Sequence, residues 1–490
     1  MMSTIILRIK NGAAVPSTSP SSSSSPLSLL LLLLLLLSSQ ACSTSAFSRS
    51  AVTFLPGFQG PLPFHLETGY VGVGESEGVQ LFYYFLKSDR NPKQDPLMLW
   101  LTGGPGCSAL SSFLFEIGPL RFRMEEYNGT LPTLVLNPDS WTKVSSIIFL
   151  DLPALTGFSY TTLPVAPQRS DSKQIQHAVQ FLRKWLTGHS EFQSNQIYIG
   201  GDSYSGLIVP AIALEISKGN EKSIEPSINF QGCLLGNPLT DDYIDNNHRI
   251  PFAHGMGLIS DELYESLKSS CGGEYHNVDN MNEACAGYIV EYGKCVSGIN
   301  YAQILEPECL FASPKPQKFS DRRSLNEMPE TLLPSDSQPP LPTITCRTYE
   351  GLLALYWAND GSVRKALGIR QGTIGTWMPC ILTPYTKEIK SSVTFHMNLS
   401  AKGYRELIYS GDHDLIVPFQ GTEAWIKSLN YSIVDEWRPW LVQGQVAGYT
   451  RTYSNGMTYA TVKGGGHTAP EYKPKECFAM FKRWISQNPL

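Results

Sequence analysis

Three residues far apart in the sequence have the side chains and the chain order of a nucleophile, an acid and a base. Ser203 lies in the stretch IYIGGDSYSGLIVP, Asp414 closes YSGDHD, and His467 closes VKGGGH. A serine hydroxyl becomes a strong nucleophile when a base takes its proton and an acid orients that base. The order therefore predicts acyl transfer through Ser203, with His467 as the base and Asp414 as the acid.

The residues around Ser203 predict a sharp turn between a strand and a helix. The apolar run 196–201 precedes the turn, and apolar residues recur at helical spacing over 204–216. This is the setting of the nucleophile elbow in α/β-hydrolases, where the turn raises the serine oxygen above the sheet. The G-x-S-x-G pattern is incomplete, because Ser205 occupies the place of its second glycine. Two alternatives stay open, a helix N-cap role for Ser203 and Asp412 as the acid.

The stretch WLTGGPGCSAL at 100–110 predicts a second part of the same site. A tetrahedral intermediate needs backbone N–H donors for its oxyanion. In this fold one donor comes from a turn after an early strand and the other from the residue after the nucleophile. We therefore expect the N–H groups of Gly104 and Tyr204 to form the oxyanion hole.

Short apolar runs alternate with helical patterns, which predicts a largely parallel sheet flanked by helices. The stretch 171–186 has helical spacing behind an Asp/Ser cap and is typical of a crossover helix. Ligands of open α/β sheets bind beyond the carboxyl ends of the strands. The expected fold class is α/β, an α/β-hydrolase fold with a disulfide-stapled insertion. The predicted strands are 97–101, 146–153, 196–201, 233–238, 406–414 and 458–467.

Residues 241–345 interrupt this alternation and predict an insertion, or lid, over the strand ends. Its cysteines predict disulfides whose pairing the sequence leaves open: Cys271, Cys285, Cys295 and Cys309. The Pro- and Ser-rich tail at 312–343 is typical of a linker and is the expected site of proteolytic nicking. Two disulfide-linked chains are then an expected product, with the hydrolase core built from 47–240 and 346–490.

Residues 1–46 have the composition of a secretory signal peptide. Basic residues and a serine run precede the leucine-rich run 27–37, which fits a signal peptide, whereas a membrane span needs roughly 20 residues. A membrane anchor and a transit peptide are the alternatives. Cleavage is expected between about Ala41 and Ala46, with no stable membrane span in the mature chain. Acceptor sequons agree with a secretory route and start at Asn128, Asn398 and Asn430.

The composition argues against several other classes of protein. The 490 residues are 42% hydrophobic and carry a net charge of −5, with no basic cluster of the kind that nucleic acids require. The cysteines have no C-x-x-C spacing. We therefore expect a globular protein that binds no nucleic acid, no metal and no cofactor.

Motifs over nearly the whole mature chain resemble the plant serine carboxypeptidase-like proteins. They include LWLTGGPGCS, DLPALTGFSY, GGDSYSG, GNPLTDD, YSGDHDLIVP, GGGHTAPEY and ECFAMFKRWI. The resemblance implies a disulfide between Cys107 and Cys346, a vacuolar or extracellular location, and a substrate site that includes Thr102, Gly103, Glu116 and Asp202.

Two of these residues depart from the peptidases of the family, which usually carry Asn and Glu at the positions of Thr102 and Asp202. The peptidases hold a terminal carboxylate with the Asn and with two acids that share a proton. Thr102 lacks the amide donor and Asp202 is one methylene shorter, so this hold should weaken. The set resembles the acyltransferase branch, which transfers an acyl group from a 1-O-β-acylglucose ester to an acceptor hydroxyl in plant secondary metabolism. A serine-type carboxypeptidase and a catalytically silent homologue are the alternatives.

Overall fold

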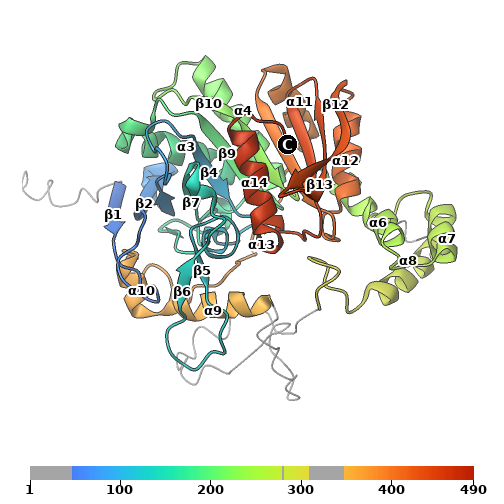
Figure 1. Ribbon diagram of the computed structural model, residues 1–490, viewed down its shortest axis with the longest axis horizontal. Helices are drawn as coiled ribbons and strands as arrows, with labels where there is room; N and C mark the ends of the chain where they lie inside the picture. Colours follow the sequence, from blue (N-terminus) through green and yellow to red (C-terminus); the bar gives the residue numbers. More distant parts are fainter. Residues whose placement is uncertain (1–46, 279–280, 308–346, 383) are drawn as a thin grey trace, which may run out of the picture. The chain divides into compact units, whose positions relative to one another are not determined.

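The structure is a computed structural model that describes residues 47–278, 281–307, 347–382 and 384–490 (Figure 1). The segment 1–46 with the predicted signal peptide, the linker 312–343, Cys309 and Cys346 lie outside the described residues. The description below concerns the unit Phe47–Leu490.

A sheet of 12 strands forms the centre of this unit, in the order β1-β2-β3-β7-β4-β9-β10-β11-β14-β13-β12, with β8 paired to β3. A separate pair joins β5 and β6. The bounds are β1 (Phe47–Val52), β2 (Leu66–Val73), β3 (Val79–Leu86), β4 (Leu97–Leu101), β5 (Leu120–Phe122), β6 (Leu134–Leu136), β7 (Ser146–Leu150), β8 (Tyr160–Thr161), β9 (Ile197–Asp202), β10 (Phe230–Gly236), β11 (Arg405–Gly411), β12 (Ile433–Val442), β13 (Gln445–Tyr453) and β14 (Met457–Val462).

The central strands confirm the predicted α/β fold. Strands β7, β4, β9, β10, β11 and β14 pair in parallel and coincide with the predicted apolar runs. Both margins of the sheet are antiparallel: β1, β2 and β3 at one edge, β13 and β12 at the other. The sequence analysis did not predict these margins. Residues 433–437 of β12 are largely exposed and lack the buried apolar run that marks the central strands.

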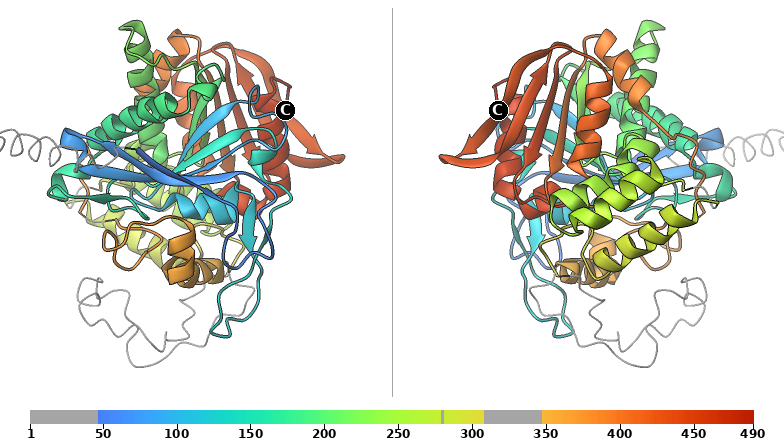
Figure 2. Two further views of the ribbon diagram at one scale, coloured as in Figure 1. Left: turned by 90° about the vertical axis from the view of Figure 1, so that its left-hand side faces the viewer. Right: turned by 90° about the vertical axis from the view of Figure 1, so that its right-hand side faces the viewer.

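Helices cover both faces of the sheet (Figures 1 and 2). One face packs on α3, which contains the predicted crossover helix, and on α4 and α12; the other packs on α9 and α14. No helix in the described ranges is both long and apolar enough to span a membrane. The bounds are α2 (Ala109–Ser111), α3 (Asp171–Gly188), α4 (Ser205–Glu221), α9 (Thr348–Asn359), α10 (Gly361–Ala366), α11 (Val393–Ala401), α12 (Phe419–Ser428), α13 (Ala469–Tyr472) and α14 (Pro474–Ile485).

The chain makes a long excursion from the sheet between β10 and β11, although these two strands are paired neighbours within it. The chain leaves the sheet after Gly236 and returns at Arg405. Helices α6, α7 and α8 lie side by side at one side of the sheet (Figure 2). The boundaries 241–345 for a separate insertion stay a prediction. The helices of this part are α5 (Asp242–Asn247), α6 (Arg249–Gly255), α7 (Asp261–Cys271) and α8 (Glu283–Val296).

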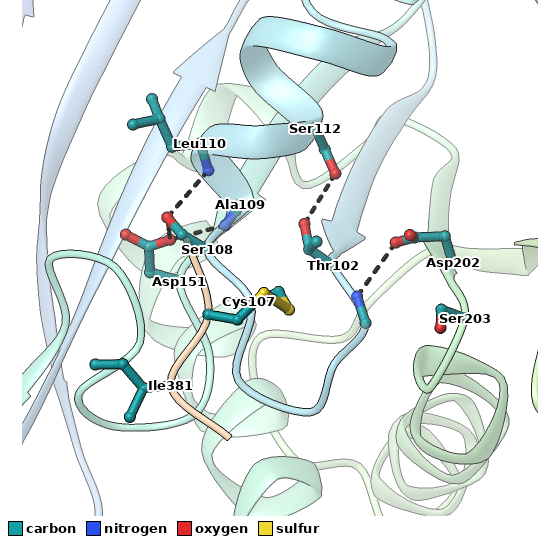
Figure 3. Close-up of a disulfide and its surroundings, with 12 residues drawn as sticks. Thr102, Cys107, Ser108, Ala109, Leu110, Ser112, Asp151, Asp202, Ser203 and Ile381 are labelled. Atoms are coloured by element: carbon teal, nitrogen blue, oxygen red, sulfur yellow. Dashed lines mark hydrogen bonds between the residues drawn. A yellow bond between two sulfur atoms is a disulfide. The ribbon is translucent and has the colours of Figure 1, made fainter. Parts of the chain in front are cut away.

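The expected disulfide between Cys107 and Cys346 is wrong. Cys107 is bonded to Cys380 instead, at an S–S distance of 2.01 Å (Figure 3). Backbone hydrogen bonds explain the pairing, because residues 379–381 run alongside the glycine-rich loop: Ser108 N to Pro379 O (2.8 Å) and Ile381 N to Gly106 O (2.9 Å).

The cysteine cluster of the insertion forms one disulfide among the described residues. Cys271 at the end of α7 is bonded to Cys285 on α8. The expected disulfide at Cys295 is not found among the described residues, where its thiol is exposed on α8 and free. The single bond links α7 to α8, as a stapled insertion requires.

Candidate active site

Ser203 occupies a strained turn between β9 and α4. Its φ is +54°, a left-handed conformation that is uncommon for residues other than glycine and is often found at functional sites. Ser203 N donates to Gly236 O at 3.0 Å, and Ser203 O accepts from Leu239 N at 2.9 Å. A Cβ on Gly206 would lie 2.5 Å from Leu239 O. The backbone of Leu239 therefore approaches the turn closely at Gly206. A side chain is tolerated one residue earlier, so Ser205 can replace the usual glycine of the elbow pattern.

His467 lies within hydrogen-bonding distance of both other residues selected from the sequence. His467 Nε2 lies 2.7 Å from Ser203 Oγ, and His467 Nδ1 lies 2.8 Å from Asp414 Oδ2. Asp412 Oδ1 instead accepts a hydrogen bond from Gly464 N at 2.6 Å and lies 2.5 Å from His413 Nδ1. The geometry therefore favours Asp414 over Asp412 as the acid.

Asp414 is fully buried and is held by further donors. Its Oδ2 accepts from Asn237 Nδ2 at 2.8 Å, and its Oδ1 accepts from Ile416 N at 2.7 Å. Burial lowers the pKa of His467, but the charge and the hydrogen bond of Asp414 raise it more, so the net pKa lies above the ordinary value of 6.5. Sequence reasoning missed Asn237, whose one signal is its place at the end of a predicted strand.

Of the two expected oxyanion donors, Tyr204 directly follows the nucleophile, and Gly104 belongs to the glycine-rich loop whose Gly103 lies against Ser203. Within the described part of the chain, neither Gly104 N nor Tyr204 N has a hydrogen-bond partner. A Cβ on Gly103 would lie 2.6 Å from Ser203 Cβ and 3.0 Å from Tyr204 N. Because Gly103 lacks that atom, the glycine-rich loop can lie against the turn of Ser203. The role of Gly104 and Tyr204 stays a prediction.

Two buried carboxyl groups, Glu116 and Asp202, and the partly buried Glu471 lie beside this site. Burial, and then the charge of Asp202, raise the pKa of Glu116 well above its ordinary value, and Glu116 Oε2 has no hydrogen-bond partner among the described residues. Burial also raises the pKa of Asp202 to about 6, although His467 opposes the shift. Burial raises the pKa of Glu471 as well. The group therefore binds protons more tightly than exposed carboxyl groups do.

The expected substrate residues Thr102 and Gly103 contact neighbouring side chains (Figure 3). Thr102 Oγ1 lies 2.8 Å from Ser112 Oγ, and Gly103 N donates to Asp202 Oδ1 at 3.3 Å. Glu116 reaches the same region from a single π-turn at Ser112–Glu116. The structure thus brings together every substrate residue selected from the sequence, while their binding role stays a prediction.

A segment between β10 and β11 holds the loops that carry the acid and the base. We name residues 301–304 the clasp. Gln303, at its centre, is buried. The hydrogen bonds of the clasp reach both loops: Leu415 N to Tyr301 O (2.9 Å), His467 N to Ala302 O (2.7 Å), Gln303 Nε2 to Gly464 O (3.0 Å) and Ile304 N to His413 O (3.2 Å). Sequence reasoning did not identify the clasp, because backbone acceptors leave no motif.

The parallel sheet and the elbow at the end of β9, with the histidine and the aspartate on loops after β14 and β11, define an α/β-hydrolase. Comparisons then identify the family. The profile of the serine carboxypeptidases matches residues 56–487. Serine carboxypeptidase-like 2 of Arabidopsis thaliana is 56% identical over 444 residues, covering 90% of this chain and 94% of that protein. Serine carboxypeptidase-like 7 of the same plant is 54% identical over 444 residues, with the same coverage.

One solved structure supports the fold independently. A prohormone-processing carboxypeptidase of Saccharomyces cerevisiae, Kex1Δp, aligns with a TM-score of 0.68 at 19% identity, covering 89% of this chain and 95% of that one. The chain belongs to the serine carboxypeptidase family. The resemblance inferred from the sequence motifs is confirmed at this level.

Proposed function

We propose that this protein is an acyltransferase that moves an acyl group from a 1-O-β-acylglucose ester to an acceptor hydroxyl through Ser203. The observation that carries the proposal is the chemistry beside the nucleophile. The nearby groups include the buried carboxyl groups of Glu116 and Asp202 and the partly buried one of Glu471, and the Thr102 hydroxyl is paired with Ser112. Such a site disfavours the terminal carboxylate of a peptide substrate, because like charges repel. Carboxyl groups are, in contrast, good hydrogen-bond partners for the hydroxyls of a sugar.

The first half of the reaction forms an acyl-enzyme. Ser203 Oγ attacks the ester carbonyl while His467 Nε2 takes its proton, and the N–H groups of Gly104 and Tyr204 stabilise the oxyanion. The C–O bond to glucose then breaks, and His467 returns the proton to the departing sugar oxygen. Asp414 stabilises the protonated imidazole between these steps.

The second half decides between transfer and hydrolysis. An acceptor hydroxyl gives its proton to His467 and attacks the acyl carbonyl. The bond to Ser203 Oγ then breaks, His467 returns the proton to Ser203 Oγ, and the acceptor leaves as an ester. Water competes at about 55 M, but well-oriented groups reach effective molarities of 10⁵ M or more. Binding of the acceptor in an ordered position therefore favours transfer.

A carboxypeptidase is the second candidate. At acid pH the carboxyl pair of Glu116 and Asp202 is at least partly protonated, since both pKa values are raised. A protonated pair donates a hydrogen bond to the terminal carboxylate of a peptide. This candidate predicts peptide hydrolysis mainly below about pH 6, the pKa of Asp202.

The test presents the purified protein with acylglucose donors and a panel of hydroxyl acceptors, and separately with blocked dipeptides, from about pH 4 to 8. We expect transfer to exceed hydrolysis, and Ser203→Ala to lower the rate at least ~10³-fold. Efficient release of C-terminal residues, with only hydrolysis of acylglucoses, would contradict the proposal. As a finer test, Thr102→Asn with Asp202→Glu should shift the ratio towards peptide hydrolysis.

A further inference from the structure

Asp171 is a fully buried acid at the first residue of α3, and no part of the proposed reaction uses it. Its Oδ1 accepts from the hydroxyls of Tyr204 (2.8 Å) and Tyr385 (2.6 Å). Its Oδ2 accepts from the backbone N–H groups of Glu388 (2.6 Å) and Ile389 (2.7 Å). An ionised carboxylate offers about four acceptor positions, so these donors use its full capacity.

One of these donors is the side chain of the residue that follows the nucleophile. We propose that Asp171 is a positioning residue, which fixes the backbone N–H of Tyr204 towards the oxyanion by anchoring the Tyr204 hydroxyl. This inference rests on the proposed acyl transfer through Ser203.

The Tyr204 side chain is suited to transmit this restraint. It is 4% exposed and begins at the N-cap of α4, beside Ser203. The ring is rigid, so fixing its hydroxyl at one end limits the movement of the Cα at the other. Ser203 O already accepts from Gly206 N and Leu239 N, and these bonds hold the other side of the same peptide unit. Asp171 supplies the second anchor for that unit.

The same carboxylate also holds a second segment against Tyr204. It holds residues 385–389, and the Tyr385 ring lies edge-on to Tyr204 with centroids 6.0 Å apart. Asp171 N donates to Thr386 O at 3.3 Å, and Gln174 Nε2 donates to the Tyr385 hydroxyl at 2.7 Å. Residues 385–389 are therefore tied to α3, and Tyr385 packs against Tyr204.

The test compares matched variants, each of which removes one buried tyrosine hydroxyl from one buried carboxyl group. Tyr204→Phe deletes the anchor and leaves the backbone N–H in place. Tyr83→Phe is the control, because its hydroxyl donates to Glu67 Oε1 at 2.7 Å from β3. The probe is p-nitrophenyl acetate, whose burst of p-nitrophenol reports acylation of Ser203 and needs no knowledge of the acceptor.

We expect Tyr204→Phe to lower the acylation rate constant about 5- to 50-fold with KM unchanged within about twofold, less than the 10²- to 10³-fold that loss of a whole oxyanion donor costs. Tyr83→Phe should stay within about twofold of the wild-type rate constant. Asp171→Asn should lose at least as much as Tyr204→Phe, and the double variant no more than Asp171→Asn alone. If Asp171→Asn does not fold, the comparison of Tyr204→Phe with Tyr83→Phe still tests the inference.

A Tyr204→Phe rate constant within twofold of wild type would overturn the inference. So would an equal loss in Tyr83→Phe, since this would indicate a general effect on stability. The thermal midpoints of both variants are measured alongside, and a purely structural role would lower the midpoint without changing the acylation rate constant. If the wild-type protein gives no burst and a fluorophosphonate does not label Ser203, then the proposed function has failed. If the burst occurs but the acyl group passes only to water, then the transferase proposal fails while this inference is still tested.

Discussion

The burial of Glu116 makes the stability of the folded chain depend on pH. The side chain is 4% exposed and one of its oxygens has no partner among the described residues. Its pKa is raised above the ordinary value of 4.5, so the folded chain holds this proton to a higher pH than the unfolded chain does. Stability therefore falls as the pH rises past about 4.5 towards the folded-state pKa.

Glu116→Gln should raise the thermal midpoint at pH 7 by at least about 2 °C, because glutamine is neutral like the protonated acid and leaves no charge to bury. At pH 4 both proteins carry a neutral side chain at this position, so the difference should disappear. Scanning calorimetry at the two pH values measures this. Glu125→Gln, at an exposed side chain, is the control and should change neither midpoint. A gain of equal size at pH 4 would contradict the explanation.

Among the elements, the clasp at 301–304 links the excursion from the sheet to the catalytic loops. Its hydrogen bonds meet the loops of Asp414 and His467 through backbone atoms and one buried glutamine. Beyond the clasp, Arg347 donates to both oxygens of Glu306 (2.8 and 3.1 Å) and to Glu471 O (3.1 Å). The positions of the acid and the base therefore depend on contacts outside the sheet.

Gln303→Ala removes the hydrogen bond to Gly464 O and should lower kcat about 3- to 10-fold, since a misplacement of 1 Å can cost 10²-fold. Lys294→Ala on the exposed face of α8 is the matched control in the same excursion. Steady-state kinetics on a p-nitrophenyl ester would measure both variants. Unchanged kcat in Gln303→Ala would show that the backbone bonds alone hold the loops.

The two disulfides should differ in their contribution to stability. Cys107–Cys380 spans 273 residues and Cys271–Cys285 spans 14. In the chain-entropy model these loops correspond to roughly 5.6 and 3 kcal/mol. Urea unfolding of the two paired Cys→Ser variants should rank them in this order. Activity should fall only in the first pair, because Cys107 lies in the loop of Gly104. The reverse order would indicate that structure in the unfolded chain outweighs loop length.

At the scale of the whole molecule, the sequons agree with the proposed secretory route. Asn128, Asn398 and Asn430 are all exposed. Asn128 and Asn430 lie in loops, whereas Asn398 lies within α11 and its sequon serine, Ser400, is buried. Accessible sequons in loops are the usual acceptors.

Expression in a plant secretory system should yield a chain that starts between about Ala41 and Ala46 and carries glycans at Asn128 and Asn430 in preference to Asn398. Intact mass before and after glycosidase treatment, with peptide mapping, measures this. Recovery of an unprocessed chain without glycans in plastids would contradict the secretory route. Mapping of the same sample also reports whether the chain is cut within 312–343, which stays a prediction.

The sequence alone determined the central strands and the identity and order of Ser203, Asp414 and His467. Parallel strands buried on both faces need continuous apolar runs, and residues that follow such runs meet at one edge of the sheet. These features are local in sequence, so they could be predicted.

Only the tertiary structure decided the partner of Cys107, the support of Asp414 by Asn237, the clasp, and the four donors on Asp171. Each depends on segments that are far apart in the chain, and many of the contacts use backbone atoms, as when residues 379–381 run beside the glycine-rich loop. Backbone N–H and C=O groups are the same at every position apart from proline, so their pairing leaves no pattern of side chains to read. The chemistry could therefore be inferred from side-chain types, whereas the contacts that hold it in place could not.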